Sequence, residues 1–166
     1  MNFEKDSRSK NYEVRCGVAR HPDCPSNILE FLSMDNEWVV RWYVAGNPNC
    51  PIHILEILSR DESYGMRCSV AENPNCPEKA LEILSRDENS GVRGNVASNL
   101  NCPSNILEIL SRDENSDVRR GVAINVNCPG NILETLALDQ RYEIREYVSK
   151  HKNCSEEIRV AFTLEN

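Results

Sequence analysis

Residues 40–61 read VRWYVAGNPNCPIHILEILSRD, and residues 66–87 read MRCSVAENPNCPEKALEILSRD, so one pattern returns after 26 residues. A period between about 20 and 50 residues is typical of tandem-repeat proteins, in which each unit buries its apolar face by stacking on its neighbours. The period divides the 166-residue chain into a leader and six units. The leader is residues 1–10, and the units are 11–36, 37–62, 63–88, 89–114, 115–140 and 141–166.

Each unit predicts two short helices. In the fifth unit, Val118 and Val122 follow the spacing of one helical face, and Ile132, Leu133 and Leu136 do so in the second segment. Helices of two or three turns are marginal alone, so these depend on packing. A proline opens the second helix in five units, as its first helical residue. The preceding Asn-x-Asn predicts a tight connection, because Asn tolerates left-handed conformations and forms side-chain turns. We expect an all-α fold, in which one helix of each unit could be 3₁₀.

Charge and length narrow the class of protein. The net charge is −7 and no unit is strongly basic, whereas a surface that tracks nucleic-acid phosphates needs clustered Lys and Arg. No apolar run approaches the roughly 20 residues that a membrane span needs, and the leader lacks the apolar stretch of a secretory signal. We therefore expect a cytoplasmic monomer with a charged, frayed leader and a single six-unit domain over residues 11–166.

The repeat motif is Val-Arg-x-x-Val-Ala-x-Asn-Pro-Asn-Cys-Pro-x-x-x-Leu-Glu-x-Leu-Ser-x-Asp. It resembles the leucine-rich repeat variant family, a HEAT-like helical array, and the resemblance covers residues 11–166. The resemblance implies a right-handed α-solenoid with helices in two layers, a class of generic binding scaffolds. Some members carry an N-terminal iron–sulfur module with clustered cysteines; this sequence shows no such cluster, so we expect no cofactor.

A cysteine row marks the repeat most clearly. Its members are Cys24, Cys50, Cys76, Cys102, Cys128 and Cys154. Each precedes the proline that opens the second helix, or Ser155 in the sixth unit, and is therefore predicted at the N-cap. At that position a helix lowers the pKa of a thiol. That position leaves open a thiol redox or metal sensor. However, metal ligands must all reach one ion at about 2.3 Å, and stacked helices about 8–10 Å apart exceed the Cα separation of about 7 Å that a disulfide tolerates. We expect buried structural cysteines, with no metal site and no disulfide.

An arginine row and an aspartate row also follow the repeat. The arginines are Arg15, Arg41, Arg67, Arg93, Arg119 and Arg145, and the acids are Asp35, Asp61, Asp87, Asp113 and Asp139, with Glu165 in the last unit. An arginine in every unit could form a row that binds anions. Because guanidinium and carboxylate groups pair bidentately, we expect instead that the two rows pair and tie one unit to the next.

Aromatic side chains gather in the first three units. Tyr12, Trp38 and Tyr64 share the second place of their units, and Trp42 and Tyr43 lie nearby. Trp and Tyr are enriched at binding hot spots, so these five residues are the candidate partner-binding site. The alternative is that the rings pack between the layers or cover an open end of the core.

The sequence shows no catalytic constellation, because it has no phosphate loop, no nucleophile elbow and no His-Glu-x-x-His motif, and its three histidines lie in different units. We expect a non-enzymatic scaffold that binds a protein or peptide. Nucleic-acid binding, as in HEAT-like DNA-alkylation repeat proteins, is the alternative that the acidic charge and the paired arginines disfavour. The thiol sensor is the third reading.

Overall fold

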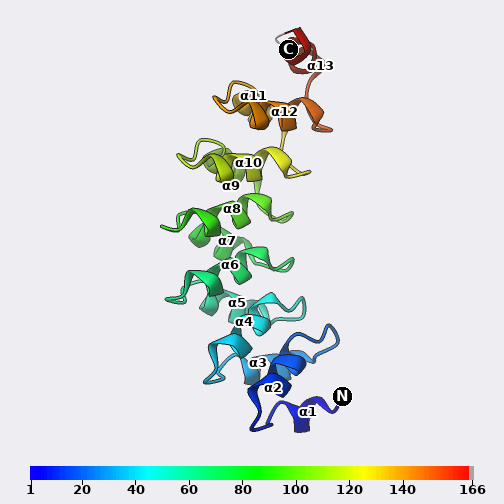
Figure 1. The fold of residues 1–166 in the computed structure, drawn as a ribbon, viewed down its shortest axis with the longest axis vertical. Coiled ribbons are helices and arrows are strands. Elements are labelled where there is room, and N and C mark those ends of the chain that lie inside the picture. Colours follow the sequence, from blue (N-terminus) through cyan, green and yellow to red (C-terminus); the bar gives the residue numbers. More distant parts are fainter. Residues whose placement is uncertain (165–166) are drawn as a thin grey trace. The chain divides into compact units, whose positions relative to one another are not determined.

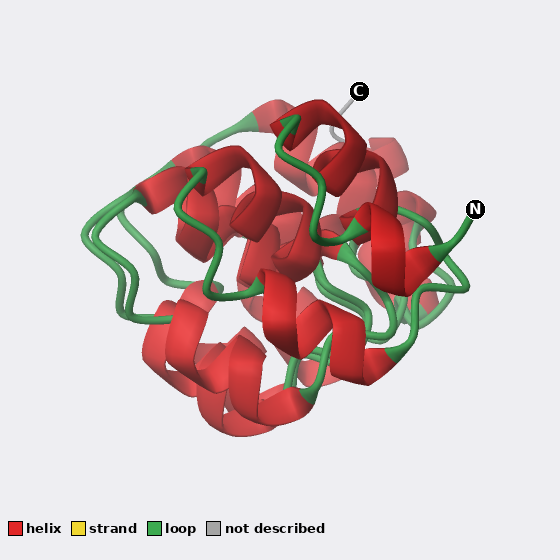
Figure 2. Cartoon of the chain, turned by 90° about the horizontal axis from the view of Figure 1, so that it is seen from below, coloured by secondary structure: helices red, strands yellow, loops and turns green. Residues whose placement is uncertain are grey.

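A computed structural model describes residues 1–164, which form thirteen α-helices and no strand (Figures 1 and 2). Every described helix is α-helical, so the 3₁₀ helices that the sequence allowed are not found in this part of the chain. Residues 165–166, including the predicted pairing residue Glu165, lie outside the described residues. The all-α prediction is confirmed.

The chain divides into two compact units, Met1–Ile83 and Leu84–Asn166, and each is described by itself. That residues 11–166 form a single domain stays a prediction. The first unit contains α1 (Phe3–Asp6), α2 (Tyr12–Ala19), α3 (Ser26–Leu32), α4 (Trp38–Gly46), α5 (Ile52–Leu58) and α6 (Tyr64–Glu72). At the boundary lies α7 (Glu78–Leu84). The second unit contains α8 (Ser90–Ser98), α9 (Ser104–Leu110), α10 (Ser116–Ile124), α11 (Gly130–Leu136), α12 (Tyr142–Lys150) and α13 (Glu156–Leu164).

Within each unit, the first helices of successive repeats pack side by side. In the first unit α2 packs on α4 and α4 on α6; in the second, α8 packs on α10 and α10 on α12 (Figure 1). The second helix of a repeat packs against the first helix of its own repeat and of the next, as α3 does against α2 and α4. The repeated sequence therefore becomes two layers of helices in each unit.

The core is the part of the repeat that changes least. In α4, Val44 and Ala45 are fully buried, and in α5 Leu55 is fully buried; the equivalent positions are also buried in the first five repeats. In the sixth repeat, the equivalents of Ala45 and Leu55 are Ser149 and Arg159, which are only partly buried. Because a helix of seven to nine residues is unstable by itself, burial of this stripe is what holds each one.

The prolines differ from the prediction by one position. Pro25, Pro51, Pro103 and Pro129 are N-cap residues with extended ψ angles between 139° and 153°, so each helix begins at the following residue. A proline can fill this place because its carbonyl, not its absent N–H, makes the first helical bonds.

The leader is ordered rather than frayed. It forms the one-turn helix α1, whose N-cap Asn2 accepts a hydrogen bond from the Lys5 N–H at 3.1 Å. Phe3 packs edge-on against the His21 ring, with centroids 5.2 Å apart. Arg15 also donates to the Ser9 carbonyl at 2.7 Å, so the first repeat holds the end of the leader.

The loop asparagines act through their side chains. No described residue has a positive φ angle, so these loops do not use left-handed conformations. The expected side-chain turn is present, because the Asn47 side-chain oxygen accepts the Asn49 N–H at 2.8 Å. The buried Asn47 side chain also donates to the Ala19 and His21 carbonyls at 2.6 and 2.9 Å. Asn125 does the same in the second unit, reaching the Ala97 and Asn99 carbonyls at 2.8 and 2.9 Å. Each asparagine therefore satisfies carbonyls of the preceding repeat.

Candidate functional site

The arginine row pairs with the aspartate row in a fixed geometry. Arg93 donates from Nε and Nη2 to the two Asp113 carboxylate oxygens at 2.7 and 2.9 Å. Its third donor, Nη1, reaches back to the Asp87 carbonyl at 2.7 Å. Arg15 with Asp35 and Arg119 with Asp139 repeat this bidentate contact. One guanidinium thus joins the end of one repeat to the end of the next.

The pairing changes the ionisation of these carboxyl groups. Burial acts to raise the pKa of Asp113, but hydrogen bonds from Arg93 and the Asn115 N–H, together with the charge of Arg93, outweigh it and leave the pKa below its usual value. The hydrogen bond to Asp113 raises the pKa of Arg93. Asp35 and Asp139 show the same balance. These carboxylates are therefore committed to the scaffold.

Arg41 is an exception to the row. Its Nη1 donates to the Asp35 and Asn36 carbonyls at 2.7 and 3.3 Å, as the other arginines do to their preceding repeats. Within residues 1–164, however, Arg41 makes no hydrogen bond or ion pair with Asp61, although Asp61 accepts the Ser63 N–H at 2.8 Å like its equivalents. The sequence predicts the same pair in all repeats, and this one is not formed.

The candidate aromatic residues begin three neighbouring helices. Tyr12, Trp38 and Tyr64 are the first residues of α2, α4 and α6, which pack side by side, and they are 45%, 62% and 60% exposed. Trp42 is exposed as well and packs edge-on against the half-buried Tyr43, with ring centroids 5.0 Å apart. We call these five residues the aromatic surface. The structure places all of them on the first-helix layer of the first unit.

The second unit has no comparable row. Ser90 and Ser116 occupy the first places of α8 and α10, and only Tyr142, in α12, is aromatic. Tyr142 stacks on Phe162 at a centroid distance of 5.6 Å. The aromatic surface is therefore a property of particular residues and not of the repeat.

The cysteine row is buried and chemically quiet. Each of these cysteines lies two residues before the first residue of a second helix, so none is at the N-cap position that the sequence predicts. Desolvation raises the pKa of Cys50 and Cys76 to about 12 and that of Cys24 and Cys128 to about 11. Thiolate chemistry therefore requires partial opening of the fold.

The described residues form no metal cluster. Residues 1–164 contain no group of three or more His, Cys, Asp or Glu side chains that could hold an ion, and no disulfide. His53, three residues after Cys50 in the sequence, faces Glu30 at 3.2 Å, and both side chains are exposed. Among the same residues, no helix is at once long and apolar enough to cross a bilayer.

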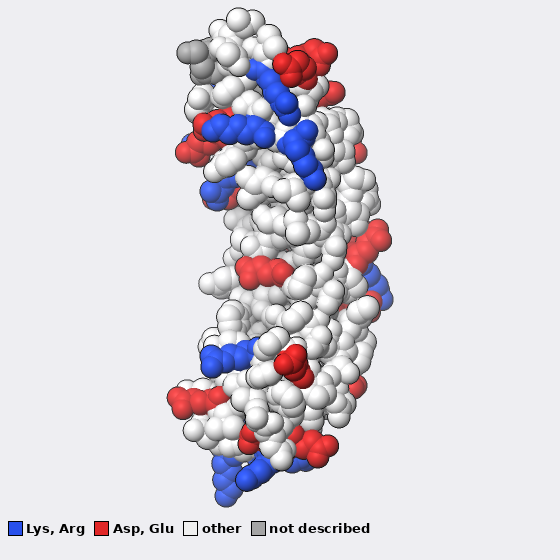
Figure 3. All heavy atoms as spheres, turned by 90° about the vertical axis from the view of Figure 1, so that its right-hand side faces the viewer, with Lys and Arg blue, Asp and Glu red and all other residues white. Residues whose placement is uncertain are grey.

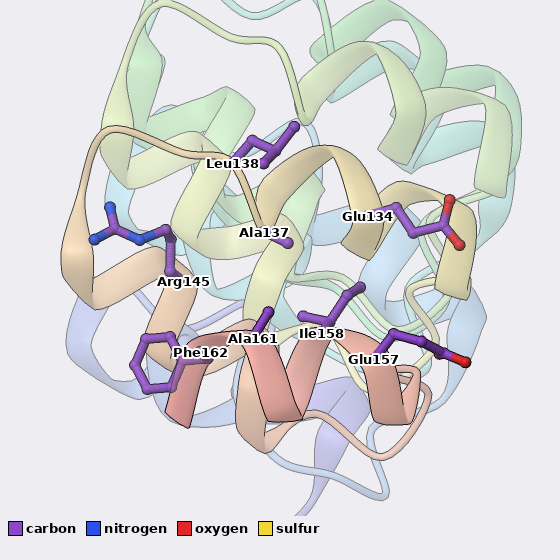
Figure 4. A pocket seen from close by; sticks show the side chains of 8 residues that line it. All are labelled: Glu134, Ala137, Leu138, Arg145, Glu157, Ile158, Ala161 and Phe162. Carbon is purple, nitrogen blue, oxygen red and sulfur yellow. The ribbon is translucent and has the colours of Figure 1, made fainter. Parts of the chain in front are cut away.

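The sequence did not indicate a cavity of about 320 Å³ in the second unit (Figure 4). Ala137, Ile158 and Phe162 contribute apolar atoms, while Arg145 stands at one end, opposite Glu134 and Glu157. Its volume is at the low end of small-molecule sites. The signal that could have revealed it is the break in the repeat at the sixth unit, where Arg159 replaces the usual core leucine.

Figure 3 shows charged side chains of both signs, with uncharged residues over much of the surface between them. Three of the row arginines are paired with aspartates, so their guanidinium groups are less available to a phosphate backbone.

The buried repeat stripe, the paired rows and the asparagine contacts together define a tandem helical-repeat protein. A search of protein-family models and a search of curated proteins each gave no significant match. Among solved structures, the chain is similar to one described as a leucine-rich repeat variant with a novel repetitive protein structural motif. The two are 28% identical with a TM-score of 0.66, over 95% of this chain and 67% of the other. The resemblance seen in the sequence is therefore confirmed.

Proposed function

We propose that this chain is a non-enzymatic scaffold that binds a protein or an extended peptide through the aromatic surface. The observation that carries the proposal is the exposure of Tyr12, Trp38 and Tyr64 at equivalent places on three adjacent helices. Large aromatic side chains bury much area at little entropic cost, which is why they dominate binding hot spots. Water-exposed rings in such a row favour coverage by a partner.

The alternative, that these rings complete the core, has less support. The core beneath them is closed by residues such as Val40, Val44 and Ala45, which have no exposed surface. A ring that is 60% exposed, as Tyr64 is, contributes little to that core.

Nucleic acid is less favoured as a partner than a protein, because a net charge of −7 repels the phosphate backbone. The many unoxidised cysteines fit a reducing compartment such as the cytoplasm.

Affinity capture from a cell extract, followed by mass spectrometry, tests the proposal. We expect a partner that the wild-type chain retains and that Trp38→Ala and Tyr64→Ala lose. The control is Ile109→Ala, which removes an exposed apolar side chain from the second unit and leaves the aromatic surface intact. Equal recovery of every partner by all four proteins would argue against a role for the aromatic surface.

A further inference from the structure

The geometry points to Arg41 as an anchor for a carboxylate, so that the partner is a segment with an Asp or Glu side chain next to an apolar one. This inference rests on the proposed function and names the chemistry that the aromatic surface recognises. It depends on three observations: the fixed orientation of Arg41, the behaviour of its equivalents, and its place among the aromatic residues.

The Arg41 guanidinium is oriented but only partly used. Its Nη1 donates to two backbone carbonyls, those of Asp35 and Asn36, at 2.7 and 3.3 Å, and the side chain is half-buried. Its Nε and Nη2 have no hydrogen bond to any residue in the described range 1–164. Since the Nη1 contacts hold the group in place, these two N–H groups form a pre-oriented fork with little entropy left to lose.

The equivalent residues show what this fork binds. In Arg15, Arg93 and Arg119, the same Nε and Nη2 donors hold both oxygens of a carboxylate at 2.6 to 3.1 Å. Nη1 makes the same backbone contact in each case. The vicinity of Arg41 does contain the Asp35 carboxylate, but Arg15 already binds it. A carboxylate from a partner would reproduce the contact that Arg15, Arg93 and Arg119 make internally.

Arg41 shares helix α4 with two rings of the aromatic surface. Residues three apart on an α-helix face the same side, so Arg41 and Trp38 lie on one side of α4, and Trp42 follows Arg41 in the chain. A partner whose apolar side chain packs on Trp38 could therefore present an adjacent carboxylate to Arg41. The exposed Glu37 and Glu62 would instead attract cationic segments, but these side chains are solvated, so such attraction is weak and screened by salt.

Stability measurements test the premise without any ligand. We expect Arg41→Gln and Asp61→Asn to shift the thermal midpoint independently, so that the double variant shows the sum of the two shifts. The matched pair Arg93→Gln and Asp113→Asn should be strongly non-additive, because those side chains hold each other. Equal coupling in both pairs would mean that Arg41 is already paired with Asp61 in solution, and the inference would be wrong.

Selection from a random dodecapeptide display library, with the whole chain as bait, tests the chemistry. We expect selected peptides to contain Asp or Glu beside an apolar residue, and to bind about tenfold or more weakly to Arg41→Gln. Arg41→Lys should also weaken binding, because it keeps the charge but loses the fork. Arg60→Gln, which removes an exposed charge from the same unit, should not.

The outcomes separate the two proposals. Peptides that require Trp38 but lack acidic residues, or that bind Arg41→Gln normally, would overturn the role of Arg41 and leave the aromatic surface as a binding site. Selected peptides that are indifferent to Trp38→Ala and Tyr64→Ala would overturn both. Thermal melts of each variant show whether the fold is intact. If Arg41→Gln is unstable, peptide binding to Arg41→Lys tests the role of Arg41 in its place.

Discussion

Removal of one row arginine should measure how strongly the repeats are tied together. Arg93→Ala deletes two charge-assisted hydrogen bonds to Asp113, in a pair whose side chains are only 12% and 9% exposed. The Asp113 carboxylate would keep one partner within its unit, the Asn115 N–H at 2.9 Å. Breaking a buried ion pair costs about 3–5 kcal/mol. Because the Arg93–Asp113 pair keeps some exposure to water, we expect a loss of about 3 kcal/mol.

For a chain of this length, about 3 kcal/mol corresponds to a fall in Tm of about 6–12 °C. Thermal unfolding followed by circular dichroism at 222 nm measures it directly. Arg112→Ala is the control, because Arg112 pairs with Glu108 in the same unit but both side chains are more than half exposed. Such a pair contributes about 0–1 kcal/mol, so this variant should melt within about 4 °C of the wild type.

The pH dependence provides a second check on the same pair. The pKa of Asp113 is lower in the folded chain than its ordinary value of about 4, so the pair stabilises the fold fully above that value. The stabilisation is lost as the pH falls through the lower, folded value, and the gap between wild type and Arg93→Ala should close there. If Arg93→Ala and Arg112→Ala have the same Tm at neutral pH, the arginine row does not tie the repeats together.

Three further predictions concern packing and chemistry. Gly94→Ala should raise the free energy of unfolding by about 0.5–1 kcal/mol, since no neighbouring atom lies within 4 Å of the added methyl group. Gly121→Ala should lower it by about 1–3 kcal/mol, because its methyl group would lie 2.9 Å from the Ala97 methyl group on α8. Denaturant titration of the two variants should show changes of opposite sign. His151→Asn should preserve or raise the Tm. The asparagine at the equivalent place in other repeats, such as Asn47, donates two hydrogen bonds to the preceding repeat, whereas His151 donates one, at 3.0 Å. A fall in Tm as large as that of His151→Ala would contradict this. In native thiol titration at pH 8, Cys68 should react first and Cys50 only on unfolding, because Cys68 is the most accessible cysteine and burial raises the pKa of Cys50 to about 12; rapid reaction of all eight thiols would refute the buried row.

Much of the fold could be predicted because the repeat reports burial six times over. The Val44 position is valine in all six repeats and the Leu55 position is leucine in the first five, and a 26-residue period with two helical stripes leaves few alternatives to stacked helices. The exact place of a proline such as Pro51 could not be fixed, because N-cap and first-turn positions differ only by the ψ angle. The helix in the leader was not predicted, because its contacts, such as that of Phe3 with His21, lie outside the repeat pattern.

The candidate site shows the limit of a recurring pattern more sharply. The aromatic residues were predicted because they depart from the repeat, and Trp38 and Tyr64 are indeed exposed. Arg41 could not be distinguished, because Arg and Asp stand at the same spacing in each of the first five repeats, whether or not the pair forms. Recurrence shows that a residue has a place but does not show which atoms it contacts. For the same reason, Asn47 was read as a turn former and not as a donor to the preceding repeat.

The buried asparagine contacts have a consequence for how each unit unfolds. Asn73 donates to the carbonyls of Ala45 and Asn47, so the last turn of one first helix is completed only when the next repeat is in place. In the language of a one-dimensional Ising chain, part of the folding free energy belongs to the interface between neighbours and not to either repeat. A fragment cut between two such repeats would leave buried carbonyls without donors. Within a unit, the repeats should therefore unfold cooperatively, with one denaturant m-value set by the surface of several repeats together.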